Sequence, residues 1–220
     1  MFDYDYNAIL WLFSSCLFVR YLYFMTDVLL FSHEKYATLF FSRDRYAALS
    51  LVRRKYIQKN LIKSIYLAVL TMVAAATIVL PIWRDNNWDN WMIHRLAALY
   101  VSNDIVGLIC VEELPQTTRI HHIVSTVMVM TSFGIDFQTS DIGQAMLVYT
   151  MASASAYIVN FHLAIRWLCQ RDSLKSFRLF TGIIYVICCA FSWSWHIWWM
   201  FTRASLTLSH CLYIALLSAR

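Results

Sequence analysis

An aspartate and two adjacent histidines lie in apolar surroundings that would not be expected to carry them. Asp104 falls within the apolar run 93–111, and His121 and His122 open the next run after a short turn at 112–119. An ionisable group inside a bilayer costs several kcal/mol unless it faces a cavity or a partner. Helices joined by so short a turn are antiparallel neighbours. The sequence therefore predicts that Asp104 pairs with a histidine across the two helices.

Three roles fit this group, and the residue types leave all three open. An imidazole oriented by a carboxylate suits general acid–base catalysis or acyl transfer to an amine or a hydroxyl. A metal site is disfavoured, because adjacent residues on a helix point about 100° apart and no HxxxH spacing accompanies them. Simple structural pairing within a helical bundle would also satisfy the side chains. We expect no metal and take His121, His122 and Asp104 as candidate catalytic residues.

Other polar residues predict a cavity lining and a contact with lipid head groups. Small and polar residues recur on one helical face of the run 145–168, a spacing that lets helices approach closely or lines a lipid-sized cavity. Long basic side chains near a membrane surface extend toward lipid phosphates. The predicted cavity residues are Tyr100, Ser153, Tyr157 and Asn160, and the predicted head-group contacts are Arg53, Arg54, Lys55 and Arg166.

The composition indicates that all of these residues belong to a membrane protein. Of the 220 residues, 60% are hydrophobic and only 14% are charged, whereas a soluble domain carries roughly 25% charged residues. A transmembrane β-barrel would alternate apolar and polar residues along short strands, but here the apolar residues form long runs. The sequence therefore predicts an all-α, polytopic membrane helical bundle, with residues 1–220 as a single transmembrane domain.

The apolar runs predict the number of membrane crossings. A helix needs about 20 mostly apolar residues to cross the hydrocarbon layer, and six runs are taken as spans, of which 120–134 is short for a full span. A further run at 206–217 is shorter, so the sequence leaves open whether it forms a seventh span. The six expected spans are 8–31, 61–82, 93–111, 120–134, 145–168 and 177–201.

The distribution of basic residues predicts the orientation of these spans. Eight of the 18 lysines and arginines lie within residues 32–63, and such an excess marks the cytoplasmic or matrix side of a membrane. The N-terminus is then on the outer or lumenal side. We expect residues 34–60 to form a basic amphipathic segment on the inner face. A basic cluster can also bind nucleic acid, but one that joins two spans contacts anionic lipid, so no nucleic-acid partner is expected.

The third and fourth runs resemble the core motif of TLC-domain membrane proteins, a family that includes ceramide synthases and translocating-chain-associated proteins. The resemblance implies six or seven helices around a lipid cavity, with paired histidines that transfer an acyl group from acyl-CoA and an aspartate that supports them. Ceramide synthases follow the histidines with a longer polar motif that this chain lacks, which favours a member without synthase activity. The resemblance covers about residues 45–203 and is carried by Tyr100, Asp104, His121, His122 and Asn160.

Two functions are expected from these features. The first is binding or processing of a lipid or an acyl group in an intramembrane cavity, with acyl-CoA as substrate if the protein is an enzyme and with no bound cofactor. The alternative is a non-catalytic subunit of a larger membrane complex, such as a respiratory-chain or translocation assembly, that keeps the fold without its chemistry. Membrane lipids or other membrane subunits are the expected partners. The resemblance implies the endoplasmic reticulum, with the mitochondrial inner membrane as the alternative location.

Overall fold

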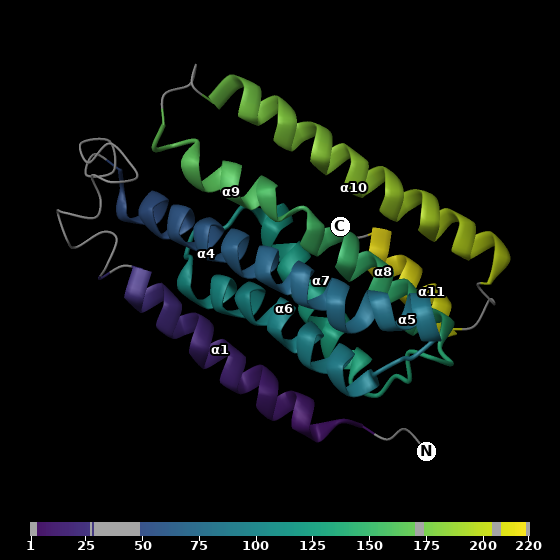
Figure 1. Cartoon of the computed structure of the whole chain (residues 1–220). Helices are drawn as coiled ribbons and strands as arrows, with labels where there is room; N and C mark the ends of the chain where they lie inside the picture. The colour runs from purple at the N-terminus through teal and green to yellow at the C-terminus, as the bar shows by residue number, and fades with distance from the viewer. Residues whose placement is uncertain (1–3, 27, 29–48, 170–173, 204–207, 219–220) are drawn as a thin grey trace.

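The computed structural model shows a bundle of helices and describes residues 4–26, 28, 49–169, 174–203 and 208–218 (Figure 1). No strand occurs among these residues. Five of their helical segments are long and apolar enough to cross a membrane, which confirms the all-helical, membrane-spanning class. These segments are α1 (Tyr6–Thr26), α4 through α5 (Leu51–Asp85), α6 (Asn90–Cys110), α8 with α9 (Asp141–Ile165) and α10 (Lys175–Thr202).

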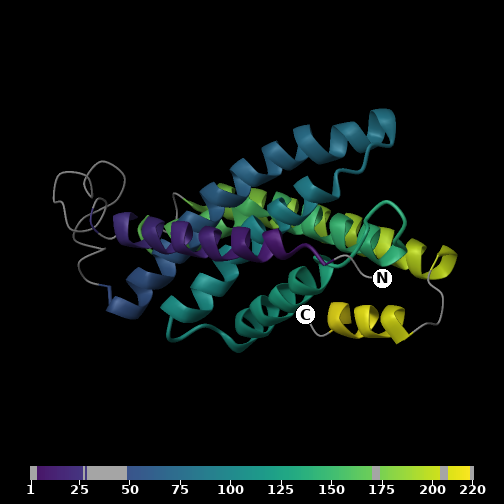
Figure 2. The ribbon, with the colours of Figure 1, turned by 90° about the horizontal axis from the view of Figure 1, so that it is seen from below.

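Two of the expected runs form helices that are shorter than these five. α7 (Gln116–Ser132) has 17 residues, and α11 (Leu208–Ser218) has 11. α7 packs along α6 with one face and exposes Ile120, Ile123 and Val127 on another. α11 lies beside the C-terminal part of α10 (Figure 2). Five crossings therefore follow from helix length and composition alone, and the sixth depends on α7.

α4 (Leu51–Ala74) begins well before the expected span, which starts at residue 61. The last ten residues of the expected surface segment are therefore the first turns of a spanning helix. The earlier part of that segment, residues 34–48, lies outside the described residues. Because α4 starts early, Lys59 belongs to the spanning helix together with Lys63, and both lysines are buried inside the bundle.

The second crossing changes its hydrogen-bonding pattern near its end. A π-helical turn, η2 (Ala75–Val79), follows α4 and leads into α5 (Leu80–Asp85). Pro81 has no N–H to donate to the preceding turn, and a π turn is one of the ways in which a helix accommodates such a loss. Asn86 then ends the segment in the left-handed conformation, with φ at 49°.

The fifth expected span is divided into α8 (Asp141–Ser155) and α9 (Tyr157–Ile165). Ala156 separates them with a ψ of 17°, and its N–H donates to the carbonyl of Ser153 at 3.3 Å. Irregular backbone at membrane depth is tolerated where it is buried in protein or lines a water-filled cavity. The break therefore indicates that this part of the helix faces the interior of the protein.

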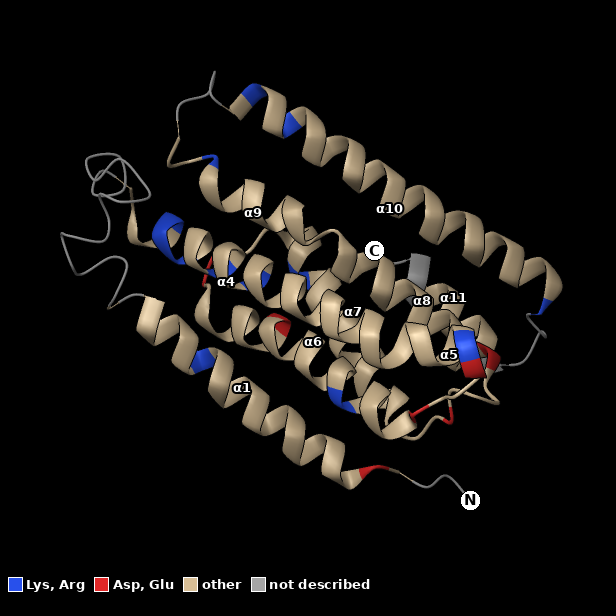
Figure 3. Cartoon of the chain, in the orientation of Figure 1, with Lys and Arg blue, Asp and Glu red and all other residues tan. Residues whose placement is uncertain are grey.

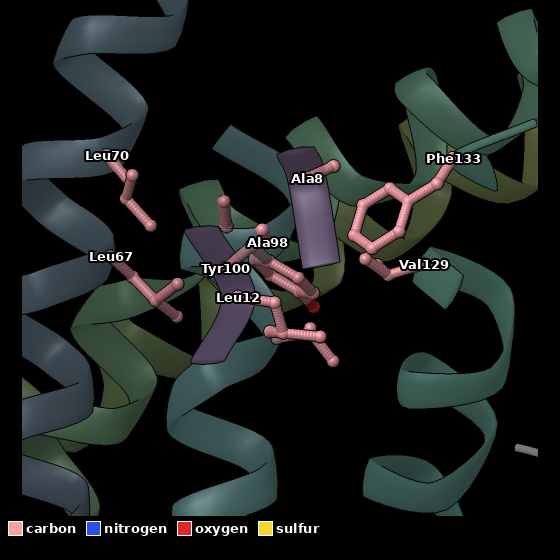
Figure 4. Packing of buried hydrophobic residues seen from close by; sticks show 10 residues of the cluster. Ala8, Leu12, Leu67, Leu70, Ala98, Tyr100, Val129 and Phe133 are labelled. Carbon is pink, nitrogen blue, oxygen red and sulfur yellow. The ribbon is translucent and has the colours of Figure 1, made fainter. Parts of the chain in front are cut away.

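The largest core cluster joins the first helices of the bundle (Figure 4). α1 packs along α6, and small residues at that contact allow the two backbones to approach. The same cluster packs α4 and α7 against α1 and α6. The helices that carry Lys63, Asp104 and His122 are thereby held in fixed positions. The labelled residues of the cluster are Ala8, Leu12, Leu67, Leu70, Ala98, Tyr100, Val129 and Phe133.

Charged residues are distributed unequally between the two ends of the bundle (Figure 3). Most described lysines and arginines lie in the half that contains the starts of α4 and α10 and the end of α9. Most aspartates lie at the opposite end, near the start of α1 and the end of α5. Asp104 is an exception, since it is a buried residue within α6.

Candidate functional site

Asp104 is the centre of a buried polar cluster formed by three helices. Its Oδ1 accepts a hydrogen bond from the ammonium of Lys63 on α4 and lies 3.1 Å from Nδ1 of His122 on α7. Asp104 is fully buried, and His122 is 1% exposed. The structure therefore shows the predicted pairing of Asp104 with a histidine. It adds Lys63, which the sequence analysis counted only as part of the basic loop.

Several polar atoms of this cluster have no hydrogen-bond partner in the described part of the chain. They are Oδ2 of Asp104, both ring nitrogens of His122 and the side-chain amide of Asn103. The contact between His122 and Asp104 thus has the length of an ion pair without the alignment of a hydrogen bond. Buried polar groups in proteins are nearly always paired. Of these three residues, His122 is the one that lines the cavity described next, so its ring nitrogens are the atoms that a ligand can reach.

His121 completes a group whose ligand atoms could reach one metal ion. The ligand atoms of Asp104, His121 and His122 all lie within 4.8 Å of one another, although the sequence analysis disfavours a metal here. Lys63 disfavours metal binding, because its ammonium lies against Oδ1 of Asp104 and would repel a cation, although Oδ2 has no partner among the described residues. The charge of Lys63 thus favours an acid–base or hydrogen-bonding role for the two histidines.

The cluster adjoins a cavity of about 420 Å³ between α4, α7, α8–α9 and α10. Ligand pockets in proteins have volumes of roughly 300–1,000 Å³, so the space suffices for a small molecule or part of a lipid. α10 contributes residues spaced along one helical face, and the break at Ala156 also borders the cavity. The polar lining includes Lys59, Asn60, Lys63, His121, His122, Ser153, Asn160, Ser192 and His196.

A second, much smaller cavity of about 50 Å³ lies between α4–η2, α6, α7 and α8. Its wall is mostly apolar and includes Leu70, Ile93 and Met151. Tyr149 lines both cavities. The larger, more polar cavity and the smaller, apolar cavity therefore share Tyr149 in their walls.

The structure distributes the four predicted cavity residues among different environments. Ser153 and Asn160 line the larger cavity. Tyr100 lines the smaller one, and its hydroxyl lies 2.9 Å from Oγ of Ser153. Tyr157 is not among the lining residues of either cavity and packs against the core cluster of Figure 4.

The predicted head-group residues lie together at the basic end of the bundle. The guanidinium groups of Arg53 and Arg166 lie 4.9 and 5.2 Å from the ring centroid of Trp167. Lys55 is 3.6 Å from the carboxylate of Glu112, and Arg54 donates a hydrogen bond to a backbone carbonyl. Their contact with lipid head groups stays a prediction.

A separate charged cluster fixes the start of α1 at the other end. Oδ2 of Asp5 accepts a hydrogen bond from Arg95 at 2.8 Å and lies 3.2 Å from Nδ1 of His94. Partial burial would raise the pKa of Asp5, but the hydrogen bonds from Arg95 and His94 outweigh it and hold the pKa below its usual value. None of the three lines either cavity, so this cluster is structural.

Comparison with known proteins does not place this geometry in a family. No protein-family model matches the chain, and neither a curated protein nor a solved structure matches it. The function of the protein is therefore inferred from the cavity and the buried polar cluster.

Proposed function

We propose that the protein binds a lipid or an acyl group in the larger cavity and acts on it through His122. The observation that carries this proposal is the buried cluster of Asp104, Lys63 and His122 beside that cavity, with the ring nitrogens of His122 lacking hydrogen bonds. Ionisable residues within membrane-spanning helices are costly and commonly mark functional sites. A merely structural cluster would be expected to satisfy its own hydrogen bonds.

The adjoining cavities support an amphiphilic ligand. The larger cavity presents lysine, histidine, asparagine and hydroxyl groups, which can bind a head group or a reacting carbonyl. The smaller cavity beyond Tyr149 presents apolar side chains, but at about 50 Å³ it has room for only a short part of a hydrocarbon chain. Most of the chain would therefore lie in the larger cavity, whose wall also includes Leu67, Val159 and Leu163.

The buried cluster supports acid–base chemistry on such a ligand. With Asp104 beside its Nδ1, His122 can accept a proton from a hydroxyl or an amine while that group attacks an acyl carbonyl. In transfer from acyl-CoA, the carbon–sulfur bond breaks and the departing thiolate takes up the proton that His122 releases. This is the chemistry that the TLC-domain resemblance implies. His121, which is partly exposed in the same wall, is positioned to relay the proton.

We further infer a topology of six crossings, in which α7 is the sixth and the N-terminus is on the outer or lumenal side. The basic end of the bundle then faces the cytoplasm or the matrix, as the usual distribution of lysine and arginine requires. The cavity, lined by residues from the first half of α4 and the start of α7, would lie toward that inner side. The resemblance favours the endoplasmic reticulum as the location.

Native mass spectrometry of the full chain, combined with an acyl-transfer assay, tests the proposed function. The wild-type protein should retain a defined lipid, and transfer of a labelled acyl chain from acyl-CoA should be lost in His122→Ala. His162→Ala is a matched control, because His162 lies on α9 and is not among the lining residues of the cavity. It should behave as the wild type does.

Two results would contradict the proposal. A protein without a defined lipid would exclude the binding role, and lipid turnover that survives His122→Ala would exclude the role of that histidine. Recovery of the chain in a large stoichiometric complex without a defined lipid would instead support the alternative, a non-catalytic subunit of a membrane assembly. His122 would then serve only in helix packing.

A further inference from the structure

Lys59 places its amino group in the wall of the larger cavity, and no carboxylate among the described residues lies within ion-pair distance of it. The side chain lines the cavity and is only 2% exposed. Its ammonium lies 5.8 Å from the ring centroid of Tyr56 and forms no ion pair or hydrogen bond with another described residue. An ammonium group that is removed from bulk water without a partner costs several kcal/mol. The position therefore favours a ligand that supplies the missing negative charge.

We propose that the larger cavity selects an amphiphile with an anionic head group, a carboxylate or a phosphate monoester, which pairs with Lys59. This inference rests on the proposed function, because it specifies the class of lipid that the cavity takes. It concerns recognition alone and is independent of the chemistry at His122.

The lysines in the wall of the cavity outnumber the carboxylates beside it by one. Lys59 and Lys63 are the two charged residues among the described residues that line it, and neither aspartate nor glutamate belongs to that wall. Asp104 pairs with Lys63 and is fully buried. Lys63 therefore has a carboxylate partner in direct contact, whereas Asp104 acts on Lys59 only from a longer distance.

The packing of α6 holds Lys59 in this position. The aliphatic part of the lysine lies against Gly107, where a Cβ atom would come within 3.3 Å of its Cε. A larger residue at position 107 would have to displace the lysine side chain. Gly107 thus provides the space that keeps Lys59 beside the cavity.

The start of α7 adds a second preference for an anion. Thr117 and Thr118 lie in the first turn of this helix and line the cavity. The first N–H groups of a helix have no partner within the helix, and the N-cap residue, Pro115, supplies no side chain that accepts from them. Such a helix end favours negative charge. Lys59 and the start of α7 therefore present positive potential to the same cavity.

Binding of three chain-matched lipids to the purified full chain in detergent tests this inference. The probes are radiolabelled oleic acid, oleoyl lysophosphatidic acid and oleyl alcohol. The two anions should bind at least about tenfold more tightly than the alcohol, since a buried charge pair contributes more than 1.4 kcal/mol. Lys59→Met should remove this preference, and Lys59→Arg should retain it. Lys175→Met is the control for loss of a lysine, because Lys175 is exposed at the start of α10 and does not line this cavity.

The relative affinities show whether the cavity binds an anionic lipid, any lipid, a free anion or none of these. Equal affinity for the three lipids would overturn selection of an anion but leave lipid binding intact. Absence of binding by all three would overturn the proposed function as well. Displacement of bound oleic acid by excess acetate or inorganic phosphate would show that the cavity recognises a free anion instead of an amphiphile. If Lys59→Met does not fold, the wild-type comparison of the anions with the alcohol still decides the question.

Discussion

The ammonium of Lys63 on α4 donates a hydrogen bond to the carboxylate of Asp104 on α6, and both side chains are buried inside the bundle. This pair ties two spanning helices together at the point where α7 presents His122. Breaking a buried ion pair by removal of one partner leaves an uncompensated charge, whereas removal of both partners is much less harmful. The pair therefore supports the bundle and the proposed site at once.

Asp104→Asn should lower the free energy of unfolding by about 3 kcal/mol, because Lys63 loses its counter-charge. The double variant with Lys63→Met should recover a large part of this loss, and a double-mutant cycle gives the coupling energy. Thermal and denaturant unfolding in detergent micelles measure both. Lys55 and Glu112 form an exposed pair that serves as the control, with an expected coupling of about 0–1 kcal/mol. A similarly small coupling between Lys63 and Asp104 would contradict the buried pairing.

Part of this site could be predicted from the sequence. The short turn after α6 required α6 and α7 to be antiparallel neighbours, and this sufficed to predict that Asp104 would meet a histidine. Lys63 falls within the expected span 61–82, but it was missed because it was counted only among the basic residues of 32–63. Ser50 indicates where α4 begins, because its side chain caps the helix by accepting a hydrogen bond from the N–H of Arg53. A helix that starts there carries Lys59 and Lys63 one turn apart on a buried face.

The lining of the cavity was predictable only in part, because the backbone departs from a regular helix at Ala156. The apolar run 145–168 predicts one regular helix, which would place Ser153, Tyr157 and Asn160 on one face. The break at Ala156 changes the rotation between α8 and α9. Ser153 and Asn160 still reach the cavity, but Tyr157 turns to the core. No glycine or proline marks this break in the sequence.

Ser192→Phe should reduce the amount of lipid that is retained, because a bulky side chain would enter the cavity from α10. Ser194→Phe is the matched control, since Ser194 is exposed on the same helix and does not line the cavity. Native mass spectrometry of the two variants measures bound lipid directly. We expect a loss of about tenfold for the first variant and none for the second. Equal lipid content in both would argue against this cavity as the binding site.

Asp5→Asn should destabilise the protein by about 1.5 kcal/mol at neutral pH, because Arg95 and His94 lose a charged acceptor. The pKa of Asp5 is lower in the folded state than in the unfolded chain. Its stabilising effect is therefore complete at neutral pH and is lost as the pH falls from about 4 through the folded-state pKa. Unfolding measured against pH should show this acid loss in the wild type and less of it in Asp5→Asn. Asp141→Asn, at an exposed pair with Arg203, should change stability by less than about 0.5 kcal/mol.

The sixth crossing can be tested by placing single cysteines on either side of α7, with the six native cysteines replaced. At about 1.5 Å per residue, the 17 residues of α7 extend about 25 Å, which lies at the short limit for crossing the hydrocarbon layer. The N–H of Asp5 donates to the carbonyl of Phe133, so the N-terminus and the end of α7 must lie on the same side. In sealed membranes, an impermeant maleimide should label Gln138→Cys from the outer side and Glu113→Cys only after permeabilisation.

The pattern of labelling separates the number of crossings from their orientation. Both cysteines labelled from one side would mean that α7 does not cross, and the proposed cavity would then lie against a membrane surface. Labelling of Glu113→Cys alone from the outer side would keep six crossings but reverse them, against the distribution of lysine and arginine. Because α7 carries His121 and His122, its crossing also decides whether acyl-CoA approaches the cavity from the inner side. The labelling result therefore fixes the side on which any acyl-transfer assay must supply its substrate.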